Sequence, residues 1–433
     1  MSKLNLSESL TELPFNKIFF KLAIPNVCAT FFAATTVIFD LWYIGKIGIS
    51  ELAGVAYIFP IYMLTSMLSN GAFGGAVSGA TARAFGSKNI TQAECIFRSA
   101  ILIALLGAII LMFLFFSFSE KFLIYYKVDK QVSLPVISWL IVLFFHILFA
   151  TLNFNFDDRN IILTNSVTLL NGMFLFTSLE WSAISLLSGY LAGIIFILGF
   201  YFFGNHSYSL KFQDIFKLRG FFKLIKSGSI ASCQSLMTIS LALFCTTIIG
   251  NFGTNWTAGF GIAIRLELLL IPIIFGIGGA LIAIVGANVG ANKFQRAIQM
   301  TWKGTSFSVV IVGVIGLFFS IYPELWSGLF TSDLQTKVTA KAYLNLVAPF
   351  YAFFALGLGL YFVCQAFNTL FWPVVGTFLR LFYVVILTLI LFYNNLASPY
   401  LLFFTMSSGL IIYGLFISLS LHFGPWKLYY NEN

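Results

Sequence analysis

Two carboxylates stand in otherwise apolar stretches of this 433-residue sequence, and their positions make them the first candidates for chemistry. Asp40 lies in the apolar run 18–41 and Glu267 in the run 262–285. If these runs cross a membrane, a buried carboxylate is costly and usually marks an ion or substrate pathway. Asp40 follows Lys21 by about 28 Å of helix, which places it toward the outer end of its run. Desolvation favours a protonated carboxylate, so Asp40 is a candidate proton carrier; the alternative is a solvated, passive interface residue.

Two arginines complete the charged side chains inside apolar runs. Arg265 stands two residues before Glu267, roughly 200° around a helix, so these two side chains do not face each other. Arg380, in the run 371–393, is an alternative partner for Glu267. Such a pair either fixes neighbouring helices or contributes to a substrate site, and both interpretations remain open.

The remaining polar candidates are neutral side chains. His146 could relay protons, although a hydrogen-bonded packing histidine is the simpler interpretation, and Asn171 could line a cavity. The three histidines are far apart in the sequence, and the five cysteines show no metal-ligand or disulfide spacing. There is also no P-loop and no cluster of titratable residues, which disfavours ATP-driven transport and a membrane enzyme. We therefore expect no metal site and no cofactor.

The elements that position these residues follow from composition. Hydrophobic residues make up 59% of the chain, charged residues only 9%, and the mean hydropathy is +0.95. A soluble domain carries about 25% charged residues, so an all-α integral membrane protein is predicted. Apolar runs bounded by charge, Gly or Pro predict twelve transmembrane helices, at 18–41, 53–76, 96–118, 136–156, 161–178, 183–203, 230–249, 262–285, 306–322, 342–364, 371–393 and 400–421.

The distribution of Lys and Arg predicts the orientation of these spans. With both termini inside, 16 of the 24 Lys and Arg residues lie in inner segments and 6 in outer segments. Both termini are therefore expected in the cytoplasm, and the protein in the inner (plasma) membrane. The net charge of +9 is explained by these loops and requires no nucleic-acid partner.

A repeat divides the chain into two halves. Residues 44–54 (IGKIGISELAG) match 249–259 (IGNFGTNWTAG) at an offset of 205, and Gly86 pairs with Gly290 at 204. The basic segment 204–226 lies between the halves. We expect two six-helix lobes, 1–203 and 227–433, with 204–226 as a cytoplasmic linker. Six is an even number, so the lobes are related by a pseudo-two-fold axis along the membrane normal.

Small residues and prolines predict how some spans pack and bend. Gly71, Gly75 and Gly79 recur every four residues, which is typical of a surface for close helix packing. Prolines inside spans free backbone carbonyls and permit bending, and they stand at Pro25, Pro60, Pro272 and Pro349.

The same landmarks resemble a known family. Residues 39–54 are similar to the opening of the multidrug and toxic compound extrusion (MATE) transporters. Residues 258–297 resemble the family's eighth span with its Gly-x-Asn-x-Gly-Ala turn, here 286–291. Asp40 together with Arg265-x-Glu267 is similar to the DinF-like branch. The resemblance implies twelve helices in two lobes around a V-shaped cleft, and efflux of organic cations driven by H⁺ or Na⁺.

One position departs from the pattern of that branch. Its members usually carry Asn-x-x-x-Asp in the fifth span, where the Asp helps to form the ion site. Asn171 matches the Asn, but Leu175 stands at the Asp position. Because Na⁺ needs several oxygen ligands, coupling through Asp40 and Asn171 is expected to use H⁺ rather than Na⁺.

The expected function is thus a cation-coupled antiporter that works by alternating access on small organic, cationic substrates, as a monomer in the lipid bilayer. Two alternatives share its architecture: a flippase of lipid-linked precursors and a metabolite exporter. A flippase is disfavoured because a cleft for pyrophosphate would be more basic than Arg265 and Arg380 can make it.

Overall fold

The computed structural model describes residues 9–47, 63–125, 179–203, 220–424 and 426, and these are almost entirely helical. Eight helices in these ranges are long and apolar enough to cross a membrane. The expected spans 136–156 and 161–178 lie outside the described residues, as does much of 53–76.

Three of the described helices in the first half are longer than the apolar runs within them. The elements of this half are α2 (Phe15–Ile47), a π-helical segment η1 (Met67–Gly74) that continues into α4 (Gly75–Gly86), α5 (Ile90–Tyr125) and α8 (Leu179–Phe203). Pro25 lies inside α2, as expected for a bent span.

The second half is described almost completely. Its helices are α9 (Phe221–Gly250), α10 (Thr254–Gly290), α11 (Phe294–Ile321), α12 (Pro323–Ser327), α13 (Leu334–Val347), η3 (Ala348–Phe350), α14 (Tyr351–Phe367), α15 (Phe371–Tyr393) and α16 (Pro399–Phe423). Pro349 lies in the 3₁₀ turn η3, which joins α13 and α14 into one candidate span. Helix α9 begins at Phe221, within the segment 204–226 that the sequence marks as a linker.

Helix α13 begins with a side-chain cap. Asp333 Oδ2 accepts the backbone N–H of Thr336 at 2.8 Å, which satisfies one of the free donors at the helix N-terminus. The hydrogen bonds from Thr336 hold the pKa of Asp333 below its usual value. The segment before α13 is therefore fixed against the helix that follows it.

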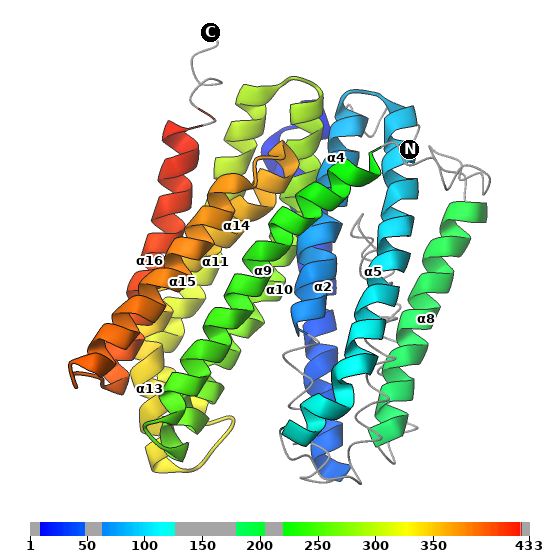
Figure 1. Cartoon of the computed structure of the whole chain (residues 1–433). Coiled ribbons are helices and arrows are strands. Elements are labelled where there is room, and N and C mark those ends of the chain that lie inside the picture. The colour runs from blue at the N-terminus through cyan, green and yellow to red at the C-terminus, as the bar shows by residue number, and fades with distance from the viewer. Residues whose placement is uncertain (1–8, 48–62, 126–178, 204–219, 425, 427–433) are drawn as a thin grey trace.

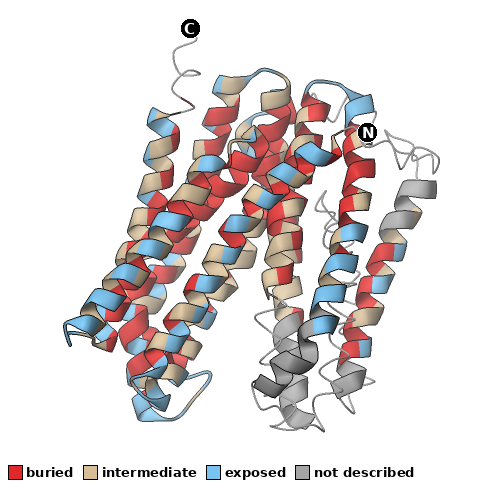
Figure 2. Ribbon diagram, in the orientation of Figure 1, coloured by how far each residue is buried: buried red, intermediate tan, exposed pale blue. Residues whose placement is uncertain are grey.

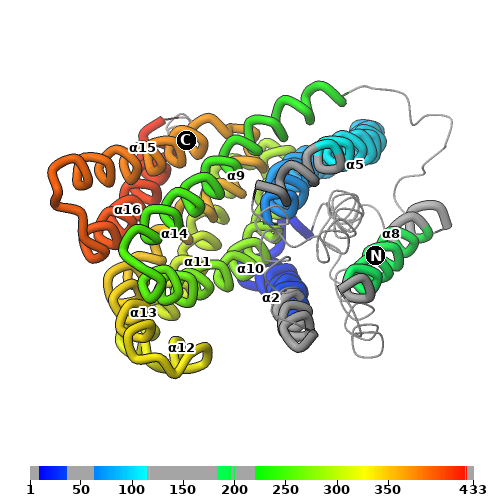
Figure 3. Tube along the Cα trace, turned by 60° about the horizontal axis from the view of Figure 1, so that its bottom comes forward, coloured from blue at the N-terminus to red at the C-terminus, as the bar shows by residue number. Residues whose placement is uncertain are grey.

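The helices form two groups that meet along α10. Figures 1 and 3 show α2, α5 and α8 on one side and the helices from α9 onward on the other. Helix α10 packs against α2 and α4 of the first group and against α11, α13 and α14 of its own. It is buried along most of its length, whereas the outer faces of α5, α11 and α15 expose large apolar side chains (Figure 2). Those exposed faces suit contact with lipid.

The structure shows the internal repeat directly. Helix α5 begins at Ile90 and α11 at Phe294, an offset of 204. The turns before them are alike: Lys88 and Asn292 have φ values of 56° and 59°. The linking residues are 87–89 in the first turn and 291–293 in the second, and their backbone N–H groups donate to equivalent carbonyls. For example, Ser87 donates to Arg83 and Ala291 donates to Ala287.

The two copies of this turn also pack on each other. A Cβ atom at Gly86 would lie 2.0 Å from the Ala287 carbonyl oxygen, and one at Gly290 would lie 2.0 Å from the Arg83 carbonyl oxygen. At the offset of 204, Ala287 is the equivalent of Arg83 and Gly290 is the equivalent of Gly86. Gly86 therefore contacts the equivalent of Arg83, and Gly290 contacts Arg83 itself. Such a reciprocal contact is what a pseudo-two-fold axis between the repeats produces.

Candidate functional site

The proposed proton carrier lies on a described helix. Asp40 belongs to α2, which runs unbroken to Ile47, but the α2 side chains from residue 37 onward are not among those described. Asn171, Leu175 and His146 lie outside the described residues. The roles of these residues therefore stay predictions.

Glu267 and Arg380 meet inside the second helix group. The Arg380 guanidinium lies 3.8 Å from Glu267 Oε1, and the two side chains are 12% and 14% exposed. The Tyr343 hydroxyl donates to Glu267 Oε2 at 3.1 Å. The sequence left Arg380 as a possible partner for Glu267, and the structure contains this ion pair. Two buried opposite charges so close together largely neutralise each other.

Aromatic rings enclose the arginine of this pair. The Arg380 guanidinium lies 5.8 Å from the ring centroids of both Phe354 and Tyr413. Gln234 Nε2 donates to the Tyr413 hydroxyl at 3.2 Å, which ties α9 to α16. Arg380 Nε has no hydrogen-bond partner among the described residues. The polar cluster of the second group therefore contains a cation held by one carboxylate and two π faces.

Arg265 lies apart from this cluster. It is exposed, and its guanidinium lies 5.4 Å from the Phe330 ring centroid. The spacing of two residues on α10 places Arg265 and Glu267 on different faces, as expected. Within the described ranges, no three His, Cys, Asp or Glu side chains come together in a way that could hold a metal.

A π-helical segment of the second span contacts the other half of the chain. The Gly71 carbonyl, within η1, accepts Gln365 Nε2 at 2.7 Å and the Tyr361 hydroxyl at 3.3 Å. A Cβ atom at Gly75 would overlap the Gln365 side chain, and one at Gly79 would lie 2.6 Å from the Gln365 carbonyl oxygen. The expected packing role of this glycine stripe is confirmed. The π turn exposes a carbonyl that side chains of α14 then satisfy.

Further polar bonds join the halves between the middle of α10 and its C-terminal end. Asn26 Nδ2 of α2 donates to the Gly276 carbonyl at 2.8 Å, and Thr30 Oγ1 donates to the Pro272 carbonyl at 2.8 Å. Pro272 has no N–H and therefore frees the carbonyl of Leu268, one turn earlier, whereas the Pro272 and Gly276 carbonyls accept these bonds through a second lone pair. Arg83 of α4 donates to the carbonyls of Gln365 and Ala366. We call these contacts and the crossing of Gly86 with Gly290 the inter-lobe seam.

Sequence reasoning missed several residues of the seam and the cluster. Asn26 and Gln234 are amides inside apolar runs, Gln365 directly follows one, and all three are at most 3% exposed. A buried amide without a hydrogen-bond partner is costly, so an Asn or Gln within a span indicates a polar contact with another helix. Tyr343 and Tyr413 carried no such signal, because tyrosine is common in apolar helices.

Comparisons with known proteins agree with this architecture. The MatE family model matches residues 25–158 and 231–393, one match in each half of the chain. The FAD transporter of Shewanella oneidensis is 23% identical over 363 residues, covering 78% of this chain and 79% of that protein. The probable multidrug resistance protein NorM of Geobacillus kaustophilus is 26% identical over 111 residues, 26% of this chain and 24% of that protein.

A solved structure shows that the likeness extends along the whole fold. The structure described as the outward-facing conformation of a multidrug resistance MATE family transporter of the MOP superfamily superposes with a TM-score of 0.86. It covers 98% of both chains at 16% sequence identity. MATE transporters have twelve helices in two lobes, the architecture expected from the sequence. This chain belongs to the MATE family of multi-pass membrane transporters, which are not enzymes.

Proposed function

We propose that this protein is an H⁺-coupled antiporter of the DinF-like branch that exports small organic cations. The observation that carries this proposal is the pairing of Glu267 with Arg380 at 3.8 Å. It satisfies the carboxylate of the second lobe internally. Asp40 then remains as the acidic group in a span of the first lobe, and the other charge in its apolar run, Lys21, stands about 28 Å of helix away.

A lone carboxylate supports a simple exchange cycle. In an apolar span, protonation is the easiest way for Asp40 to lose its charge. A cationic substrate neutralises the same carboxylate, so proton and substrate compete for it. Binding of one releases the other, and a proton gradient then drives export.

The proposed preference for H⁺ over Na⁺ follows from the ligands available. Na⁺ gives up its hydration shell only where several oxygen atoms replace it. Leu175 provides no side-chain oxygen at the position where the branch usually has Asp. Asp40 and Asn171 alone form a weak Na⁺ site, whereas a proton needs only one carboxylate.

The seam supports alternating access. Its contacts run from the end that holds the α4–α5 and α10–α11 turns, where Gly86 crosses Gly290, to the middle of α10, where Thr30 bonds to Pro272. Toward the other end the two helix groups spread apart (Figure 1). We propose that the seam end is cytoplasmic, with both termini, in the inner membrane, and that this is the outward-facing state of a monomer. The lobes are 1–203 and 227–433, joined by 204–226.

One observation favours a second candidate, an exporter of an anionic aromatic metabolite. Arg380 lies between two aromatic rings and has an Nε without a hydrogen-bond partner among the described residues. An anionic group could replace Glu267 as its partner while a planar ring stacks on Phe354 or Tyr413. A relative named as an FAD transporter fits this chemistry.

Reconstitution separates the two functions. Purified protein in proteoliposomes is given a fluorescent organic cation or FAD, under a pH gradient or a Na⁺ gradient. The proposal predicts movement of the cation under the pH gradient alone. Movement of FAD that is lost in Arg380→Gln, with no movement of the cation, would establish the second candidate instead.

A further inference from the structure

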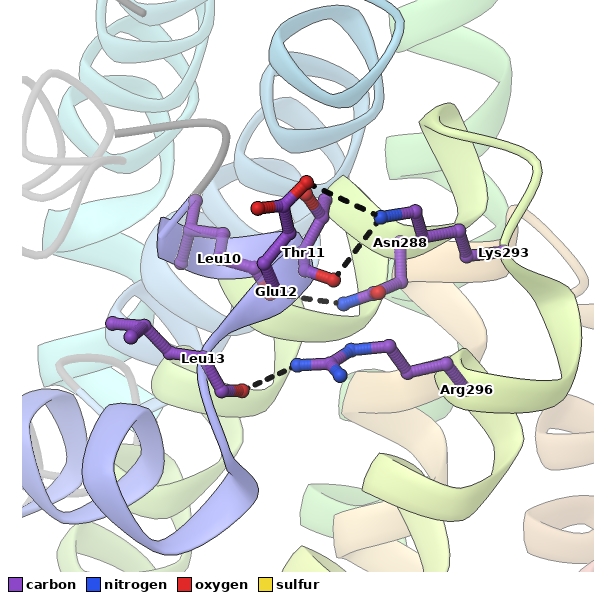
Figure 4. Close-up of polar contacts among 7 residues, drawn as sticks. All are labelled: Leu10, Thr11, Glu12, Leu13, Asn288, Lys293 and Arg296. Carbon is purple, nitrogen blue, oxygen red and sulfur yellow. Dashed lines mark hydrogen bonds and ion pairs between the residues drawn. The ribbon is translucent and has the colours of Figure 1, made fainter. Parts of the chain in front are cut away.

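A short N-terminal segment crosses from the first lobe to the second. Residues 9–14, here the N-terminal strap, form a helical turn at 9–12 and lead through Pro14 into α2. Figure 4 shows this strap against the end of α10 and the start of α11. Leu10 and Thr11 of the strap are buried, at 8% and 7% exposure.

Three second-lobe side chains bind the backbone of the strap. Asn288 Nδ2 donates to the Leu10 carbonyl at 3.1 Å, and Lys293 Nζ donates to the Thr11 carbonyl at 3.3 Å. Arg296 donates to the Leu13 carbonyl. These carbonyls lie in or directly after the helical turn at 9–12, and the C-terminal end of a helical turn is where unpaired acceptors gather and cations are favoured.

An ion pair adds to this set. Lys293 Nζ also lies 3.9 Å from the Glu12 carboxylate, which is well exposed. The carbonyl bonds do not depend on the identity of the strap side chains, whereas this ion pair does. Asn288 is fully buried and bonds back to the Ile284 carbonyl of its own helix at 2.8 Å, so its amide is held in position toward Leu10.

The strap is placed where the lobes must separate if access alternates. Asn288 and Lys293 flank Gly290, which contacts the Arg83 backbone across the seam. The strap is continuous with α2 in the first lobe, yet these donors all belong to the second lobe. Opening the seam end by moving α2 away from α10 therefore requires the strap to leave its donors.

We propose that the N-terminal strap is a releasable clasp that holds the seam end closed and sets how often the transporter exposes that end. This inference rests on the alternating access proposed above. Release needs three hydrogen bonds, two of them from charged donors, to break together. Removing both charged donors is expected to raise the population with an open seam end roughly tenfold.

The test measures opening without using transport. Ala82 of α4 is 8% exposed and lies across the seam from Gly286, where an added Cβ atom would be 2.6 Å from the Ala82 Cβ atom, so an Ala82→Cys variant should react with a membrane-permeant thiol reagent only when that end opens. The background carries serine in place of the exposed Cys28 and Cys233 and the half-buried Cys95. Lys293→Gln/Arg296→Gln is compared with Lys303→Gln, an exposed lysine on the same helix α11.

With the reporter cysteine in place, the Lys293→Gln/Arg296→Gln variant should be labelled about ten times faster than the same protein with Lys293 and Arg296 intact. The Lys303→Gln variant should be labelled at the rate of that intact protein. Equal rates in the double variant and in Lys303→Gln would overturn the proposal. A wild type that shows no gradient-driven movement would instead count against the proposed function, because the labelling rate does not depend on transport.

A second variant tests the strap by holding it closed with a removable covalent link. Glu12→Cys and Lys293→Cys, placed at the two ends of the 3.9 Å ion pair, are joined by a short cleavable bifunctional thiol reagent. Joined protein should lose transport and recover it after cleavage of the reagent. Full transport by the joined protein would show that the strap need not release, and would refute the proposal.

Discussion

The crossing of Gly86 with Gly290 provides a quantitative test of how the lobes meet. A methyl group at either glycine would lie 2.0 Å from a backbone carbonyl oxygen of the opposite lobe. Ordinary contact for a Cβ atom begins at 3.4 Å, so the two backbones must separate by 3.4 − 2.0, about 1.4 Å. Backbone atoms on both sides cannot rotate away as a flexible side chain can.

The expected size of the effect follows from the cost of overpacking. Forcing extra methyl groups into a well-packed contact costs about 1–3 kcal/mol. Each 1.4 kcal/mol is tenfold in an equilibrium constant, so Gly290→Ala should lower the closed-to-open ratio of the seam end roughly 5- to 150-fold. Because the contact is reciprocal, Gly86→Ala should shift the ratio in the same direction by a similar factor.

Spin labels at the two turns provide the assay. Cysteines at Lys88 and Asn292, on the equivalent turns, carry labels for pulsed electron-spin distance measurements in lipid. Gly290→Ala should add or enlarge a long-distance population. Gly261→Ala on the same helix is the control, because nothing lies within 4 Å of its added Cβ atom. Identical distance distributions for Gly290→Ala and Gly261→Ala would refute the seam as described.

Three further predictions concern charge, ion choice and topology. Glu267→Gln should leave Arg380 buried without its partner and lower the stability of the protein by about 3–5 kcal/mol, whereas Glu267→Arg/Arg380→Glu should recover part of the loss in thermal unfolding; no recovery would mean that the pair does not act as a pair. Leu175→Asp should make transport in proteoliposomes sensitive to Na⁺, because it adds the missing carboxylate; an unchanged ion dependence would place the ion site elsewhere. A cysteine at Lys217, in the basic segment 204–226, should react only with permeant reagents in intact cells; labelling by an impermeant reagent would contradict the cytoplasmic placement of that segment.

The sequence predicted the helices and the repeat because both are written in local patterns. Apolar runs define spans wherever the chain crosses lipid, and the glycines at 71, 75 and 79 indicated close packing without naming the partner. The pairing of Glu267 with Arg380 was reachable by elimination, since few charges stand inside spans.

The remaining features depend on how distant segments meet. The π turn at η1 is stabilised by Gln365, nearly 300 residues later, so no local pattern predicts it. The strap is bound mostly through its carbonyls, which leave no signature in the sequence. Helix ends were also underestimated at α9 and α11, whose first turns contain lysine or arginine beyond the apolar run.

Gradient-driven export by wild type and by Asp40→Asn tests the central claim most directly. Both proteins are reconstituted, and movement of a fluorescent organic cation is followed under a pH gradient without Na⁺. The account predicts movement by wild type and none by Asp40→Asn, although the variant folds and inserts, because the amide cannot exchange a proton for a cation. Normal movement by Asp40→Asn, or wild-type transport that requires a Na⁺ gradient and ignores pH, would contradict it.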